Sequence, residues 1–194
     1  MKWFLLVAVV LAFSTAATAE DKKAEGPIKL TLVAKTDKYK LDTGGKTVAE
    51  YKKELEGIAK EAKKGGLVRP PKPPAVDLVL QLTNMSKEEV TIYVGGDSNV
   101  YTFDLTGGDT LTMNSGLSFT ADFKLPKAVT VAAGKSYEIP VKQLSDGSRG
   151  ASRYVYWTGT GDYKLSAKYT LASQDGGKGT ELKSEPVKIT VTEK

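Results

Sequence analysis

The sequence predicts an all-β protein: an antiparallel sandwich that carries one inserted amphipathic helix and a proline-rich connector. From residue 76 onward, short apolar stretches alternate with turn sequences about every 8 to 12 residues, a spacing typical of β-sandwiches. Residues 163–171 alternate strictly between apolar and polar side chains, which indicates a strand with one buried face. Residues 47–63 are the stretch in which apolar side chains recur at helical spacing.

The N-terminal residues 1–19, MKWFLLVAVVLAFSTAATA, have the features of a cleaved signal peptide. A lysine at position 2 precedes an unbroken apolar run over residues 4–13, and the tripeptide ATA at 17–19 fits a cleavage site of small residues. The apolar run is much shorter than the roughly 20 residues that a membrane-spanning helix needs. We therefore expect a periplasmic or secreted protein with no membrane anchor after cleavage of the signal peptide.

The remaining chain is predicted to form one domain. Residues 20–27 are rich in charge and are expected to be flexible, and residues 28–194 are expected to form a single β-sandwich domain with a helical insertion at 46–74. The alternating stretch IKLTLVA at 28–34 predicts the first strand, and residues 38–42 are expected to continue it after a kink.

The insertion has clear start and stop sequences. Thr47 and Glu50 form a T-x-x-E capping box at the start of the helix expected at about 47–63. Gly65 and Gly66 are typical of a helix C-terminus. The stretch RPPKPP at 69–74 then predicts a stiff connector of polyproline type.

The strand after Gly161 predicts buried tyrosines. Its inward-facing residues are expected to be Tyr163, Leu165, Ala167, Tyr169 and Leu171. The tripeptide Gly161-Asp162-Tyr163 also resembles a tyrosine corner, in which a tyrosine at the start of a strand donates a hydrogen bond to backbone just upstream. Antibody domains place a cysteine two residues after that tyrosine, whereas this chain has Leu165.

The candidate partner-binding residues are Arg149, Arg153, Tyr154, Tyr156 and Trp157. Arginine next to tryptophan and tyrosine is typical of protein-interface anchors. One hypothesis is recognition of another exported protein, including inhibition of a protease; another is glycan binding through Trp157 or Tyr154. The alternative, which we favour, is that Trp157 and one tyrosine pack in the core while an arginine caps a strand edge.

The composition argues against most catalytic chemistry. The chain has no histidine and no cysteine, which excludes Ser-His-Asp triads, thiol nucleophiles and His- or Cys-ligated metals. We expect no enzyme, cofactor or metal site. The net charge of +5 comes mostly from dispersed lysine, so no nucleic-acid binding is expected.

Four short motifs are better explained as turns. The sequence Asp42-Thr43-Gly44 matches a motif of aspartic proteases, but it lies between a predicted strand and a capped helix. The loops GGDSN at 95–99 and SQDGG at 173–177 have too few carboxylates for a calcium site. Asn84 lies in an Asn-Met-Ser glycosylation sequon, and we interpret it as a turn asparagine.

Taken together, VDLVLQLTNMSKEEVTIYV, AVTVAAGKSYEIPV and YWTGTGDYKLSAKY resemble the strands and turns of small bacterial immunoglobulin-like domains. That group includes the intracellular proteinase inhibitor family of bacilli. The chain is more similar to a family of uncharacterised secreted bacterial proteins with the same helical insertion and the sequence GGD after the second strand. The resemblance implies an immunoglobulin-like antiparallel sandwich. It implies no functional residues, because its motifs are turn and packing motifs.

Overall fold

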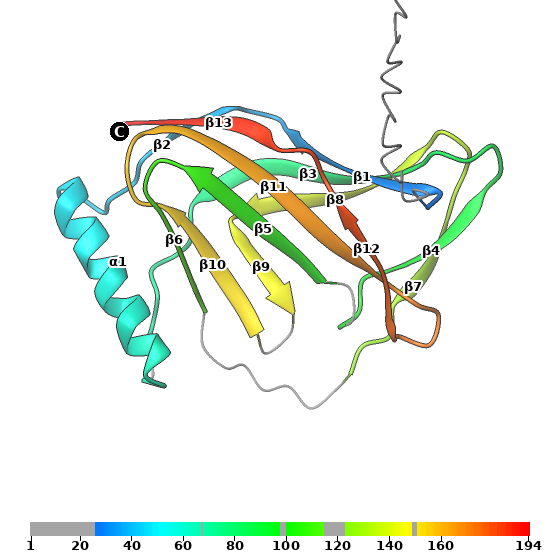
Figure 1. Ribbon diagram of the computed structural model, residues 1–194, viewed down its shortest axis with the longest axis horizontal. Coiled ribbons are helices and arrows are strands. Elements are labelled where there is room, and N and C mark those ends of the chain that lie inside the picture. The colour runs from blue at the N-terminus through cyan, green and yellow to red at the C-terminus, as the bar shows by residue number, and fades with distance from the viewer. Residues whose placement is uncertain (1–25, 67, 98–99, 115–122, 149–150) are drawn as a thin grey trace, which may run out of the picture.

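The computed structural model describes residues 26–66, 68–97, 100–114, 123–148 and 151–194. Over these ranges the chain is mostly β-strand with one α-helix, which confirms the predicted all-β class (Figure 1). The elements are β1 (Ile28–Ala34), β2 (Lys38–Lys40), α1 (Val48–Lys63), β3 (Ala75–Asn84), β4 (Val90–Val94), β5 (Val100–Gly107), β6 (Thr110–Asn114), β7 (Lys127–Val131), β8 (Ser136–Gln143), β9 (Ser145–Ser148), β10 (Ala151–Trp157), β11 (Gly161–Ala172), β12 (Lys178–Lys183) and β13 (Val187–Thr192).

The strands form two sheets. The smaller sheet has the order β1-β3-β8, and the larger has the order β2-β13-β11-β5-β9-β10-β6. In the larger sheet β12 and β4 also pair with β11, and β7 pairs with β4. Described neighbours are antiparallel except for β2, which runs parallel to β13. The expected kink after β1 is therefore a change of sheet, because β1 pairs with β3 while β2 joins the other sheet.

The buried side chains of both sheets belong to one hydrophobic core. In the smaller sheet, Leu78, Leu80 and Leu82 of β3 are fully buried. In the larger sheet, β11 buries the alternate residues from Tyr163 to Tyr169 and exposes Lys164 and Lys168, as predicted. The last inward position expected on this strand, Leu171, is half-buried.

The helix begins and ends as the sequence predicts. The Thr47 side chain accepts from the Glu50 N–H, and the Glu50 carboxylate accepts from the Thr47 N–H at 3.0 Å, which completes the capping box. Gly65 has a φ of 82°, and Gly66 donates to the Glu61 carbonyl oxygen at 3.1 Å, as in a Schellman motif.

Helix α1 lies beside β6 at the end of the larger sheet, away from β4 and β7 (Figure 1). Tyr51, Leu55 and Ala59 on one side of the helix are buried. Edge strands expose unpaired backbone groups that invite association with other chains. By covering the β6 edge, the insertion protects one end of the sheet.

Two segments differ from what their sequences predict. The polar stretch QLSDGSRGAS at 143–152 predicts a loop, but it contains β9 and the start of β10, which pair with each other. The stretch SFTADFKL at 118–125 predicts a strand; residues 118–122 lie outside the described ranges, and residues 123–125 are not in a strand. The structure also adds β12, a polar strand that the sequence does not predict.

The predicted signal peptide at 1–19 lies outside the described residues. Within the part of the chain that the structure describes, no helix is both long enough and apolar enough to cross a membrane.

Candidate functional site

The aromatic run of β10 is mostly part of the core. Trp157 is only 2 % exposed, and its ring centroid lies 5.4 Å from that of Tyr39 and 6.5 Å from that of Tyr163. Tyr156 is fully buried and donates a hydrogen bond of 2.6 Å to the carbonyl oxygen of Pro71 in the proline-rich connector. Burial raises the pKa of the Tyr156 hydroxyl well above its usual range. Both rings pack in the core, as in the interpretation that the sequence favours, and the hypothesis that Tyr156 and Trp157 are surface anchors is wrong.

Arg153 holds a buried carboxylate. Its guanidinium donates two hydrogen bonds of 2.8 Å to the carboxylate of Asp146, whose side chain is fully buried, and a third of 3.2 Å to the Phe103 carbonyl oxygen. The same carboxylate accepts from the Phe103 N–H at 2.5 Å. The hydrogen bond with Asp146 raises the pKa of Arg153. Arg153 thus fastens the β9–β10 hairpin to β5, although a third of its side chain is exposed.

The other two candidate partner-binding residues are Tyr154 and Arg149. Tyr154 is half-buried, with its ring packed edge-on against that of Tyr156 at 6.4 Å. Arg149 lies outside the described residues. Tyr156 and Trp157 are buried, and the guanidinium of Arg153 is paired with the Asp146 carboxylate. The structure therefore does not bring the five candidate residues together on one exposed surface.

The predicted tyrosine corner is confirmed by its hydrogen bond. The Tyr163 hydroxyl donates to the Gly159 carbonyl oxygen, four residues upstream, at 2.7 Å. It also lies 3.3 Å from the Asp109 carbonyl oxygen, which accepts the Thr158 N–H at 2.8 Å. The corner thereby joins the start of β11 to the turn before β6.

The motifs assigned to turns make turn hydrogen bonds. The Asp42 carboxylate accepts from the Gly44 N–H at 3.1 Å, a bond that lowers the pKa of Asp42. Asp175 accepts from the Ser173 hydroxyl and the Gly177 N–H, and both bonds lower its pKa. In the described ranges, no group of three or more Asp, Glu, His or Cys side chains is placed to hold a metal ion.

Asn84 is a buried structural residue. Its amide nitrogen donates to the carbonyl oxygens of Glu88 and Val131 at 2.7 and 2.8 Å. Its amide oxygen accepts from the N–H and the hydroxyl of Ser86 at 2.9 and 2.7 Å. The nitrogen that a glycan would modify is therefore fully used inside the fold.

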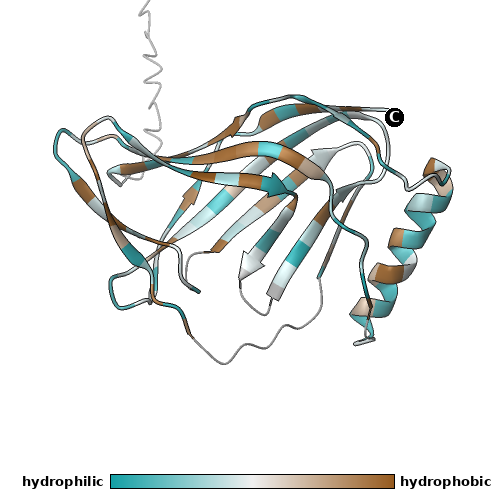
Figure 2. Ribbon diagram, turned by 180° about the vertical axis from the view of Figure 1, so that it is seen from behind, coloured by the Kyte–Doolittle hydropathy of each residue, from teal (hydrophilic) through white to brown (hydrophobic). Residues whose placement is uncertain are grey.

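A groove at the far end from α1 is the strongest candidate for a binding site. It has a volume of about 520 Å³, and its lining residues come from β4, β7, β8 and the segments next to them: Val94, Gly95, Gly96, Lys124, Leu125, Lys127, Val129 and Tyr137. Two large apolar side chains stand out at this end, Phe123 at 63 % and Leu125 at 64 % exposure. Hydrophobic residues mark the segment that leads into β7 (Figure 2).

Close backbone packing holds this segment in place. The Asp97 N–H donates to the Lys124 carbonyl oxygen at 2.9 Å, and the Asp97 carboxylate accepts the Lys124 N–H at 2.8 Å. A Cβ on Gly96 would lie 2.7 Å from the Lys124 carbonyl oxygen, so only glycine allows this approach. Phe123 and Leu125 lie over Gly176 in the β11–β12 turn, within 3.4 Å of the position that a Cβ there would take. The two side chains are thus exposed on a fixed support.

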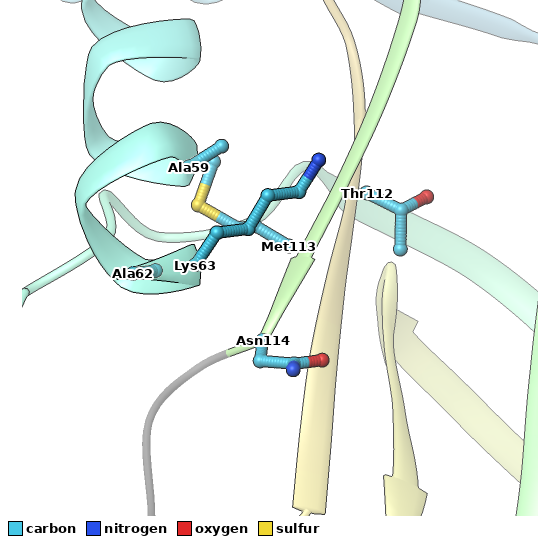
Figure 3. A pocket seen from close by; sticks show the side chains of 6 residues that line it. All are labelled: Ala59, Ala62, Lys63, Thr112, Met113 and Asn114. Atoms are coloured by element: carbon cyan, nitrogen blue, oxygen red, sulfur yellow. The ribbon is translucent and has the colours of Figure 1, made fainter. Parts of the chain in front are cut away.

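A second, much smaller cavity lies between the helix and the sheet (Figure 3). It measures about 120 Å³, and its lining residues from α1 and β6 are Ala59, Ala62, Lys63, Thr112, Met113 and Asn114. Its volume is well below the roughly 300 to 1,000 Å³ of ligand pockets. We attribute it to imperfect packing between the inserted helix and the edge strand.

Sequence reasoning missed the groove. Its residues lie on separate segments, between Val94 and Tyr137, and the stretch with Phe123 and Leu125 had the alternation of an ordinary strand. Comparison with known proteins gives no further guidance, because no family model and no curated protein matches the chain.

Proposed function

We propose that this chain is an exported binding domain with an immunoglobulin-like β-sandwich fold, which recognises another exported protein through the groove beside Phe123 and Leu125. The change of sheet between β1 and β2, the shared core and the hydrogen-bonded tyrosine corner support the sandwich. The features of a signal peptide in residues 1–19 support export.

The observation that carries the binding proposal is the pair of exposed apolar side chains beside the groove. Large apolar residues that are mostly exposed are favourable anchors for a partner because their burial removes apolar surface from water. Loop residues on a rigid β scaffold commonly carry recognition. The groove's volume also lies within the range of known binding pockets.

This proposal moves the recognition surface away from β10. Glycan stacking on Trp157 or Tyr154 required an exposed ring, but Trp157 is buried, and Tyr154 is half-buried with its ring edge-on against that of Tyr156. Protein binding by Arg153, including inhibition of a protease, required a free guanidinium, and Arg153 is bound to Asp146. The groove is a better candidate because Phe123 and Leu125 beside it are exposed and do not belong to the hydrophobic core.

A capture experiment with a matched control tests the proposal. Phe123→Ser combined with Leu125→Ser removes both exposed side chains. Met85→Ser is the control, because Met85 is similarly exposed at 62 % but lies in the β3–β4 turn. After cross-linking to the host's exported proteins, the wild type and the control should retain the same partner, and the double variant should lose it. Retention of that partner by the double variant would contradict the proposal.

A further inference from the structure

The groove has a positive rim. Lys124 and Lys127 both line it and are exposed, and neither ammonium group is ion-paired within the described residues. None of the described residues that line the groove is acidic, and the carboxylate of nearby Asp97 accepts the backbone N–H of Lys124. Other exposed lysines, such as Lys142 and Lys188, are instead paired with aspartates. In the described part of the chain, no ion pair neutralises the two charges of this rim, so both are accessible to a partner.

The rest of the groove is apolar. Val94 is buried, Val129 and Tyr137 are half-buried, and Leu125 is mostly exposed beside them. Apolar side chains of a partner would lose their contact with water here, while charged groups on the same partner could reach the two lysines. Pairing of opposite charges across such an interface mainly gives specificity and speeds association.

The strands on the two sides of the groove favour an extended partner. Val129 belongs to β7 and Tyr137 to β8, which are consecutive strands in different sheets. Among the described strands, β7 pairs only with β4 and β8 only with β3, so neither has a second described strand along its other edge. Extended peptides commonly bind to such edges and place alternate side chains in neighbouring pockets.

We infer that the groove binds an extended, acidic protein segment in which carboxylates alternate with apolar side chains. This inference rests on the proposed function and specifies the chemistry of the partner. The carboxylates would pair with Lys124 and Lys127, and the apolar side chains would pack against Leu125, Val129 and Tyr137. Two lysines without arginine or stacked aromatic rings do not form a nucleic-acid surface.

Binding of two synthetic peptides to the full chain tests this inference. The probes are the fluorescently labelled heptapeptides ELEFELE and KLKFKLK, which share their apolar residues and have opposite charges, measured by fluorescence anisotropy. We expect ELEFELE to bind at least tenfold more tightly and its affinity to fall as salt is added, because salt screens charge pairs at an exposed rim. Lys124→Glu combined with Lys127→Glu should reverse the preference, and Leu125→Ser should weaken binding of ELEFELE without reversing it.

Lys164→Glu is the control for the charge reversal. Lys164 is exposed on β11, eight residues before Ala172, which pairs with Tyr93 next to the groove. It therefore lies roughly 26 Å away along the strand. This variant should keep the preference of the wild type, and circular dichroism should show that every variant is folded.

The other outcomes overturn the inference in distinguishable ways. Equal affinity for the two peptides would refute the inference that the partner is acidic but would leave the proposal of binding in the groove unaffected. Absence of binding by either peptide at millimolar concentration would overturn the inference, while the capture experiment with Phe123 and Leu125 would still decide the proposed function. Binding to phosphatidylglycerol vesicles without peptide binding would assign the groove to an anionic membrane surface instead.

Discussion

Arg153 and Asp146 form an ion pair, and replacing Arg153 should destabilise the fold more than replacing Asp146. The Asp146 side chain is fully buried, whereas a third of the Arg153 side chain is exposed. Arg153→Met leaves a buried carboxylate that keeps only the Phe103 N–H as its partner. Removing one partner of a buried ion pair typically costs about 3–5 kcal/mol. We expect the free energy of unfolding to fall by about that amount, a large part of the roughly 5–15 kcal/mol of a typical domain.

Asp146→Asn should be milder. The asparagine oxygen can still accept the Phe103 N–H, and the guanidinium of Arg153 can turn toward water through its exposed side. The expected loss is the cost of weakened hydrogen bonds, about 1–3 kcal/mol. The sequence-based hypothesis that Arg153 contacts a partner has a different consequence, since a surface arginine could be removed with little loss of stability.

Urea unfolding followed by circular dichroism measures these differences, with Lys168→Met as the control. Lys168 forms an exposed pair with Glu181 at 3.7 Å, so its removal should cost less than about 1 kcal/mol. If Arg153→Met costs no more than the control, the pair does not stabilise the hairpin. If Asp146→Asn costs more than Arg153→Met, the reasoning from the exposure of the guanidinium is refuted.

Three further outcomes follow from burial. In a Trp3→Phe variant, which leaves Trp157 as the single tryptophan, fluorescence should be blue-shifted and poorly quenched by acrylamide until the protein unfolds; ready quenching of the native state would place the indole in solvent. Burial raises the pKa of six tyrosines, including Tyr156 and Tyr169. Their contribution to stability is therefore complete below about pH 10, the usual tyrosine pKa, and declines above it. The share of the tyrosinate absorbance that these six of the nine tyrosines contribute should rise together with unfolding and not before it. Asn84→Ala removes four hydrogen bonds and should lower the free energy of unfolding by roughly 2–4 kcal/mol in a thermal or urea titration, whereas a change below 1 kcal/mol would mean that the amide is replaceable.

The parts of the fold that the sequence predicted depend on short-range physics. The capping box of Thr47 and Glu50 and the glycines after α1 act within one helical turn. The alternation that buries Tyr163 and Tyr169 follows from the geometry of a single strand. Such features can be recognised without knowing which distant segments they meet.

The missed parts depend on contacts between distant segments. Residues 145–148 are polar, and they form a strand because Asp146 meets Arg153 seven residues later and Phe103 on another strand. Strand β12 is polar and pairs with β11 through its backbone, so it has no apolar period to reveal it. The groove is also non-local, since it combines β4, β7 and β8 with the segment that carries Leu125.

The helical insertion covers one face of the run of bulky residues at the end of β10. Neighbouring residues of a strand point to opposite faces, so consecutive buried aromatic residues require cover on both sides. On one face Trp157 packs against Tyr39 and Tyr163; on the other, the Tyr156 hydroxyl reaches Pro71 of the connector that follows α1. The insertion therefore supplies the second cover that an aromatic run on a sheet would otherwise obtain from a partner. Because that end of the sheet is covered from within the chain, the exposed apolar side chains at the opposite end are the stronger candidates for recognition.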